Sequence, residues 1–202
     1  MSFYKTMTDL LHGREIPKNF WDDLVQNINY GGIVPVSDNI ITSEVASLTV
    51  SNISQKFHHL IIMANIRGNS GAETANDFSM RFNGDSGANY SNRYKFNFGT
   101  TIGTGVGFFL NSLSVGNCAG STSPANNFSS FFGIIPFYSF SFFNKLSLCK
   151  WCNKQNTAPN MTQGEYAGAW QNTNPITSLF FFISAQNMMV DSRISLYGMG
   201  AF

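Results

Sequence analysis

The sequence predicts a mainly β fold: an antiparallel β-sandwich of the jelly-roll kind, preceded by a short helical N-terminal segment. Two observations carry this prediction. From Ile33 onward, short runs rich in β-branched and aromatic residues alternate with turns made of Gly, Asn, Ser and Asp. No run with helical spacing lies between them, so the crossover helices of a parallel α/β fold are missing. The predicted domains are a helical segment over residues 1–36 and a sandwich over residues 37–202.

The N-terminal segment carries the pattern of one amphipathic helix. Pro17 is a favourable first helical residue, and Gly31-Gly32 ends the pattern. Between them, apolar residues recur on one helical face at Phe20, Trp21, Leu24, Val25 and Ile28. Two interpretations remain open. The helix packs on the sandwich as part of one core, or it is an attachment and oligomerisation segment.

Ten short strands are predicted after this segment. They cover residues 45–51, 59–66, 77–82, 93–98, 107–115, 130–134, 137–144, 146–151, 177–183 and 193–198. Polar, glycine-containing loops separate several of them, and two of these loops, at 116–127 and 153–168, are long enough to be functional.

The most specific local signal is the stretch Arg81-Phe82-Asn83-Gly84-Asp85-Ser86-Gly87-Ala88-Asn89-Tyr90. Asn-Gly adopts positive φ angles at low cost, Asp and Ser can bond to their own backbone, and the second Gly permits another bend. A strand that ends in a tight turn capped by Asp85 is therefore expected.

This stretch resembles the Phe-Asn-Gly-Asp-Ser/Thr-Gly-x-Asn-Tyr signature of a family of β-sandwich proteins on tailed-phage virions. Further segments match the family pattern in the same order: Leu48-Thr49-Val50 followed by His59-Leu60, Trp170 followed by Ile176-Thr177-Ser178-Leu179, and a closing Leu196-Tyr197-Gly198. One departure is that Val190-Asp191-Ser192 lacks the glycine that usually precedes the closing strand. The resemblance covers residues 45–199.

The resemblance implies a non-enzymatic virion structural protein, of the capsid-decoration or head-fibre type, that is assembled in the host cytoplasm. It would dock on phage capsid or tail proteins through its N-terminal segment and present a homotrimer that can bind host-surface carbohydrate. The alternative within the same family is a tail-fibre or tail-spike receptor-binding protein. A glycan-degrading enzyme is a third, less favoured hypothesis.

Composition points to protein partners. Only 11% of the residues are charged, against roughly 25% in ordinary soluble domains, and 20 residues are Phe. Phe131-Phe132, Phe142-Phe143 and Phe180-Phe181-Phe182 place aromatic rings on both faces of their predicted strands, so both faces need covering. The net charge of +1 gives no basic field for nucleic acid, and the apolar stretches are too short and interrupted for membrane insertion.

Catalytic and metal-binding patterns are weak. His58 and His59 are neighbours in a predicted strand and therefore face opposite sides, as do Cys149 and Cys152. The glycine-rich stretch Gly103–Gly107 leads into a strand instead of a helix with a Lys, which excludes the usual phosphate loop. The acidic residues are scattered among turns, where nothing pairs them for hydrolysis. We expect no enzyme, no metal and no cofactor.

Sugar-binding sites on β-sandwiches combine an aromatic platform with carboxylate or amide groups. The candidate glycan-binding residues with this character are Asp85, Asn89, Tyr90, Tyr94, Glu165, Tyr166, Trp170 and Asn172. A structural role remains the stronger interpretation for the turn at Asp85 and for Trp170.

Overall fold

The computed structural model describes residues 32–72, 74–154 and 161–201, and within these ranges the chain forms strands and no helix. The strands are β1 (Ile33–Ile40), β2 (Ser47–Val50), β3 (Phe57–Ile66), β4 (Thr74–Phe82), β5 (Tyr90–Phe98), β6 (Thr101–Leu110), β7 (Leu113–Ala119), β8 (Ser129–Ile135), β9 (Lys145–Lys154), β10 (Met161–Trp170), β11 (Leu179–Ile183) and β12 (Arg193–Ala201). The predicted helix with Phe20, Trp21, Leu24, Val25 and Ile28 lies outside the described residues.

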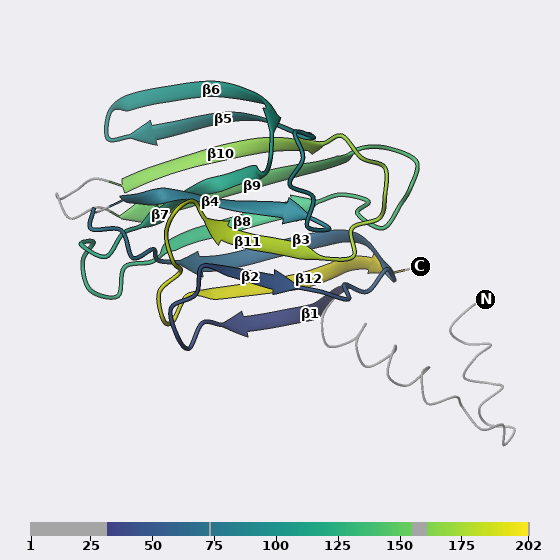
Figure 1. The fold of residues 1–202 in the computed structure, drawn as a ribbon, viewed down its shortest axis with the longest axis horizontal. Coiled ribbons are helices and arrows are strands. Elements are labelled where there is room, and N and C mark those ends of the chain that lie inside the picture. The colour runs from purple at the N-terminus through teal and green to yellow at the C-terminus, as the bar shows by residue number, and fades with distance from the viewer. Residues whose placement is uncertain (1–31, 73, 155–160, 202) are drawn as a thin grey trace, which may run out of the picture. The chain divides into compact units, whose positions relative to one another are not determined.

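The strands form two sheets (Figure 1). The large sheet has the order β1-β12-β3-β8-β9-β10-β5-β6 and the small sheet the order β2-β11-β4-β7. Every ladder with a defined register is antiparallel. The prediction of a mainly β protein with antiparallel sheets is confirmed.

The path of the chain between the sheets is regular. The pairs β1 and β2, β3 and β4, β7 and β8, and β11 and β12 each place one strand in each sheet. The pairs β5–β6 and β9–β10 do not alternate, because all four strands belong to the large sheet. They follow one another in the order β9-β10-β5-β6 and extend the large sheet beyond β8.

The core lies between the inner faces of the sheets. The ring of Phe78 on β4 packs against Phe131 of β8, with ring centroids 5.1 Å apart, and stacks on Phe181 of β11. At Gly116 on β7, a Cβ atom would come within 2.3 Å of the Trp151 ring on β9. Only glycine therefore permits this approach of the two sheets. Along β9 burial alternates, which leaves one face of the strand inside the core and the other exposed.

Eight predicted strands coincide with β2, β3, β4, β5, β8, β9, β11 and β12 to within a few residues. Two predicted strands are wrong. Residues 107–115 are the end of β6 and the start of β7, which belong to different sheets, so a chain reversal interrupts the apolar run. Residues 137–144 form a loop.

The aromatic residues of the 137–144 loop suggested a strand, but two anchors hold the segment in turns. The Tyr138 hydroxyl donates a hydrogen bond to the Ser54 carbonyl, and Nζ of the buried Lys145 donates to the Phe140 and Phe143 carbonyls at 2.6 and 3.0 Å. Because these hydrogen bonds hold the backbone in turns, the loop belongs to neither sheet. The side chains of Phe137, Phe142 and Phe143 are exposed on it.

The prediction missed β1 and β10, and it missed the start of β6. Most of β10 falls within the loop predicted at 153–168, because Gly164, Gly168 and polar residues obscure its alternation. Its inward positions are nevertheless alternate residues, among them Thr162, Tyr166 and Trp170, which are all buried.

Candidate binding groove on the large sheet

A hollow of about 880 Å³ lies on the outer face of the large sheet, over β8, β9, β10, β5 and β6. This groove is lined by side chains that point away from the small sheet, together with the backbone between them. Four of its five strands are the two pairs that extend the large sheet beyond β8. The groove is therefore built on the part of the sheet that departs from the alternating path.

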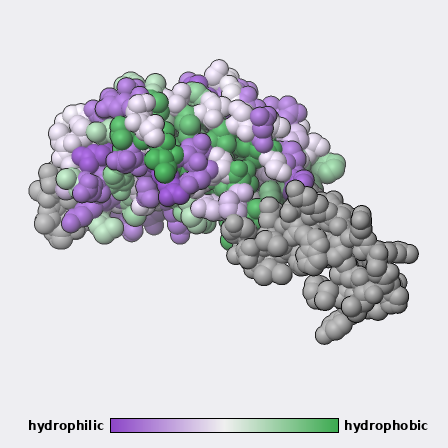
Figure 2. Space-filling model, turned by 90° about the horizontal axis from the view of Figure 1, so that it is seen from below, coloured by the Kyte–Doolittle hydropathy of each residue, from purple (hydrophilic) through white to green (hydrophobic). Residues whose placement is uncertain are grey.

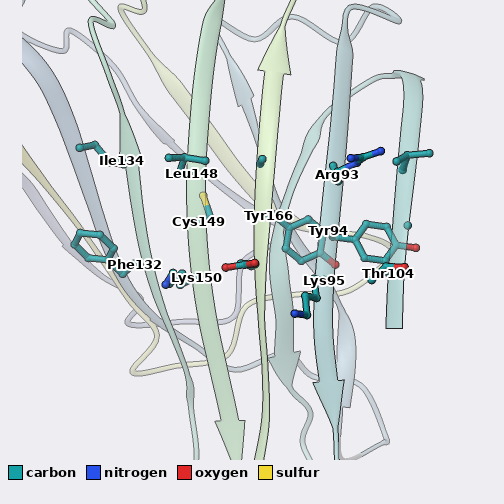
Figure 3. Close-up of a pocket in the computed structure, with 14 residues that line it drawn as sticks. Arg93, Tyr94, Lys95, Thr104, Phe132, Ile134, Leu148, Cys149, Lys150 and Tyr166 are labelled. Carbon is teal, nitrogen blue, oxygen red and sulfur yellow. The ribbon is translucent and has the colours of Figure 1, made fainter. Parts of the chain in front are cut away.

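The strand register arranges the lining side chains in two rows. The first row runs Phe132, Lys150, Glu165, Lys95 and Thr104 on successive strands. The second runs Ile134, Leu148, Ala167, Arg93 and Val106. Figure 3 shows these levels, with Ile134, Leu148 and Arg93 on one and Phe132, Lys150, Lys95 and Thr104 on the other.

The charges of the groove are unbalanced. Glu165 stands directly opposite Lys150 on one side and Lys95 on the other, and Arg93 lies in the adjacent row. Three cationic side chains thus surround one carboxylate in the lining. Lys150 and Lys95 lie two strands apart, which separates their Cα atoms by about 10 Å, and their long side chains can both reach an anionic group placed between them.

The remainder of the lining is apolar and open to solvent. Phe132, Leu148 and Val106 are 45%, 57% and 49% exposed. Apolar side chains of this size are normally buried in the core. Here they are exposed to solvent, so the groove offers apolar contact area beside its cationic side chains. A ligand with one apolar surface and an acidic group meets both features at once.

A smaller hollow of about 250 Å³ shares Lys95, Lys150 and Glu165 with the groove. It adds the amide side chains of Asn97 and Gln163, which stand opposite each other on β5 and β10. Amides donate and accept hydrogen bonds, so this end suits hydroxyl groups.

The predicted glycan-binding residues divide into two groups. Glu165 lies in the groove with an exposed side chain. Tyr94 and Tyr166 belong to its lining by position, but their rings pair at 5.3 Å on the inner face, where Tyr166 is buried. Burial raises the pKa of Tyr166 to about 12.

Asp85, Asn89, Tyr90 and Trp170 come together at the corner between β4 and β5, where they bond to one another. Asp85 accepts hydrogen bonds from the Gly87 backbone N–H, the Asn89 amide and the Trp170 indole. These bonds, the Trp170 bond foremost, lower the pKa of Asp85. The Tyr90 hydroxyl, which is buried with its pKa raised to about 12, accepts from the Phe82 N–H. The hydrogen bonds of this cluster therefore hold the corner of the chain together.

Asn172, the remaining predicted ligand residue, accepts a hydrogen bond from the backbone N–H of Asn174 and so caps its own turn. Sequence reasoning missed Arg93, Lys95, Lys150, Phe132 and Leu148. These residues occupy alternate positions on three strands, which is the one sign of a shared face that the sequence offers. The order of the strands, which brings the residues together, cannot be predicted from a local sequence pattern.

A second exposed surface is the aromatic loop, residues 136–144. The ring of Phe137 contacts Phe140 and Phe143 at centroid distances of 5.6 and 5.8 Å, and Phe142 is 82% exposed. Figure 2 shows that, on the face drawn there, green hydrophobic areas lie among purple hydrophilic ones. Phe180 and Phe182 differ, because the Arg81 guanidinium of the same chain lies over both rings.

No metal or nucleophile site stands out among the described residues. Within them no three His, Cys, Asp or Glu side chains are grouped to hold a metal ion. Burial raises the pKa of the Cys149 thiol to about 12, while Cys152 is half-buried on the opposite face of β9. A thiol with a raised pKa is a poor nucleophile.

Comparisons of the chain with protein-family models, with curated proteins and with solved structures return no match. In the described part of the chain, no helix has the length and apolar character needed to cross a membrane.

Proposed function

We propose that this chain is a non-enzymatic structural protein of a phage virion, of the capsid-decoration or head-fibre type, and that the groove on its large sheet binds acidic glycans of the host surface. The observation that supports the binding function is the groove whose lining combines three cationic side chains with exposed apolar ones. The virion assignment, and assembly in the host cytoplasm, rest on the sequence resemblance. So does docking on capsid or tail proteins through the segment with Phe20, Trp21, Leu24, Val25 and Ile28. The resemblance also implies a homotrimer, whereas the free sheet edge described below favours a dimer.

The proposed fold is a jelly-roll β-sandwich with two inserted strand pairs. Eight strands alternate between the sheets and give the orders β1-β12-β3-β8 and β2-β11-β4-β7, as two interlocked Greek keys require. The pairs β5–β6 and β9–β10 are additions to one sheet. A groove built mainly on added strands can differ between proteins that share the same eight-strand framework.

The ligand class follows from the lining. A sugar ring presents an apolar face, for which Phe132 and Leu148 offer exposed area. Carboxylate or sulfate groups on the sugar would meet Lys150, Lys95 and Arg93, whose charge exceeds that of Glu165. A neutral sugar would use only the apolar part and the amides of Asn97 and Gln163.

The engagement of the carboxylates supports a binding function over glycan degradation. Asp85 accepts three hydrogen bonds, Asp77 accepts from Ser114 and Asn117, and Asp38 is held by Arg193 and Ser195. Glu165 is the one carboxylate in the lining of the groove, whereas a hydrolase needs an acid and a base that face one bond. A tail-fibre receptor-binding protein remains the second candidate, because it would use the same groove and differ only in where residues 1–36 dock.

The test is calorimetric titration of the full chain with an acidic oligosaccharide and with its neutral counterpart of equal length. We expect the acidic ligand to bind more tightly, with an affinity that falls as salt is added. Lys95→Ala/Lys150→Ala should weaken acidic binding by at least about tenfold, since tenfold corresponds to only about 1.4 kcal/mol. Lys56→Ala, at an exposed lysine outside the groove, is the matched control. Equal binding of both ligands, or an equal loss in the control, would refute the proposal.

A further inference from the structure

Strand β6 is a free edge of the large sheet. It pairs with β5 on one side only, so the backbone N–H and C=O groups on its other side have no strand partner among the described residues. The strand is ten residues long, Thr101–Leu110, and contains neither a charged residue nor proline. Such an edge is a template for another strand.

The other sheet edges in the described part of the chain carry features that prevent pairing. On β1, Pro35 lacks an N–H group, and Asp38 is held by Arg193 and Ser195. On the small sheet, β2 has only four residues. The other edge, β7, is irregular because its register shifts beside Gly116. The register of β6 also shifts, between Gly107 and Leu110, where Phe109 has a φ of 54°, but from Thr101 to Gly107 it is regular.

The two faces of β6 differ in a way that favours a neighbouring strand. On the outer face, Ile102, Val106 and Phe108 are 63%, 49% and 67% exposed. On the inner face stand Gly103, Gly105 and Gly107, and the rings of Phe96 and Tyr94 lie over the first two. Strand β6 therefore combines an unpaired backbone edge with exposed apolar side chains on its outer face. On its inner face, side chains of β5 already cover Gly103 and Gly105.

We propose that β6 pairs antiparallel with β6 of a second copy of this chain, about a two-fold axis normal to the sheet. A second copy offers the same free, uncharged edge, so the two strands match in length and in the alternation of outer and inner side chains. Because side chains alternate, only registers that pair outer with outer residues keep both faces matched. The register centred on Gly105 places glycine opposite glycine and Thr104 opposite Val106 of the other copy, all within the part of β6 whose register is regular.

The pairing would join two eight-stranded sheets into one of sixteen strands, with both outer faces on the same side. Thr104 and Val106 of β6 belong to the lining of the groove, so the two grooves would adjoin across the axis. If the grooves bind glycans as proposed, one polysaccharide could engage both, and avidity would exceed the affinity of one groove. The pairing itself does not depend on that function.

The first test is the mass of the full chain in solution by light scattering. We expect about twice the chain mass of 22.3 kDa, whereas the trimer implied by the resemblance would give three times that mass. Thr104→Lys and Val106→Lys each place like charges near the axis and should shift the dimer toward monomer at least about tenfold. Ile40→Lys adds the same charge at a 55% exposed site on β1 and should leave the dimer unchanged. Circular dichroism checks that all variants fold.

The second test locates the contact by amide hydrogen exchange. Exchange of β6 amides should slow as protein concentration rises, while exchange along β1 should not change. A monomer or a trimer at about 100 µM chain would overturn the pairing, as would a dimer that both lysine variants leave intact or one whose β6 amides exchange at the same rate at all concentrations. None of these measurements uses a glycan, so they distinguish failure of the pairing from failure of the proposed binding function.

Discussion

The carboxylate of Asp85 accepts a hydrogen bond of 2.7 Å from the indole N–H of Trp170, a residue that is 1% exposed. This bond joins the corner after β4 to the end of β10. Beside it, the side-chain Oδ1 of Asn83 accepts hydrogen bonds from the backbone N–H groups of Thr177 and Ser178 at 2.8 and 3.1 Å. The turn after β4 and the segment that follows β10 therefore hold each other, and the side chains of Asp85 and Asn83 stabilise the fold at this corner.

Replacing Asp85 with Ala should destabilise the protein by about 2–3 kcal/mol, because the buried Trp170 N–H would lose its acceptor along with two other donors. The free energy of unfolding from urea titration measures this change. Ser86→Ala, at an exposed position in the same turn, is the control and should change stability by less than about 0.5 kcal/mol. Equal stability of the two variants would contradict a structural role for Asp85.

Replacing Gly105 with Ala should cost about 1–3 kcal/mol, because the added Cβ atom would lie 2.3 Å from the Tyr94 ring and force it away. Thermal unfolding measures the loss. Gly71→Ala is the control, since a Cβ atom there would meet nothing within 4 Å. In the double variant with Tyr94→Ala, the cost of Gly105→Ala should shrink, and strictly additive effects would rule out the contact as the cause.

The ion pair between Asp38 and Arg193 predicts an acid-side loss of stability. The hydrogen bond from Arg193, and then that from Ser195, lowers the pKa of Asp38 to about 2 from an ordinary value of 3.8. The stabilisation is therefore present above pH 3.8 and disappears as the pH falls toward 2. Because both side chains are about half exposed, the effect is small and should weaken with salt. Melting temperatures from pH 6 to pH 2 should fall less steeply for Asp38→Asn than for the unmodified protein, and parallel curves would contradict the assignment.

Sequence patterns predicted those parts of the fold that depend on neighbouring residues. The Asn83-Gly84 turn is one of them: both residues have positive φ, 52° and 68°, and the Asp85 N–H donates to the Phe82 carbonyl. What the pattern could not reveal is that β4 and β5 on either side of this turn enter different sheets. Strand β10 was missed because Gly164 and Gly168 occupy inward positions that the core normally fills with large side chains.

The groove required information that lies far apart in the chain. Lys95, Lys150 and Glu165 become neighbours only because β10 lies between β9 and β5. Each strand alone shows an ordinary exposed charge, so only Glu165 could be selected from its local context. In the same way, Gly103–Gly107 could be excluded as a phosphate loop, but its pairing with the rings of Phe96 and Tyr94 depends on the register of β5 and β6.

Replacing Lys145 with Met should destabilise the protein by about 3 kcal/mol and loosen the aromatic loop. The buried ammonium donates to the carbonyls of Phe140, Phe143 and Thr173, and Met would leave all three acceptors without it. Lys150→Met, at an exposed position of the same strand, is the control. Proteolysis within residues 136–144 should become faster only in the Lys145 variant, and unchanged cleavage would show that the loop is held by other contacts.

Replacing Glu165 with Gln should strengthen binding of an acidic oligosaccharide and leave binding of its neutral counterpart nearly unchanged. The substitution keeps the size of the side chain and removes the one carboxylate among Lys150, Lys95 and Arg93, so the positive charge that faces the ligand rises. We expect about a three- to tenfold gain, which corresponds to about 0.7–1.4 kcal/mol, largest at low salt. Glu44→Gln, outside the groove, is the matched control for the change in net charge. If both substitutions raise the affinity equally, the net charge of the protein controls binding and the groove does not; if Glu165→Gln weakens binding of both ligands, the carboxylate itself accepts a sugar hydroxyl.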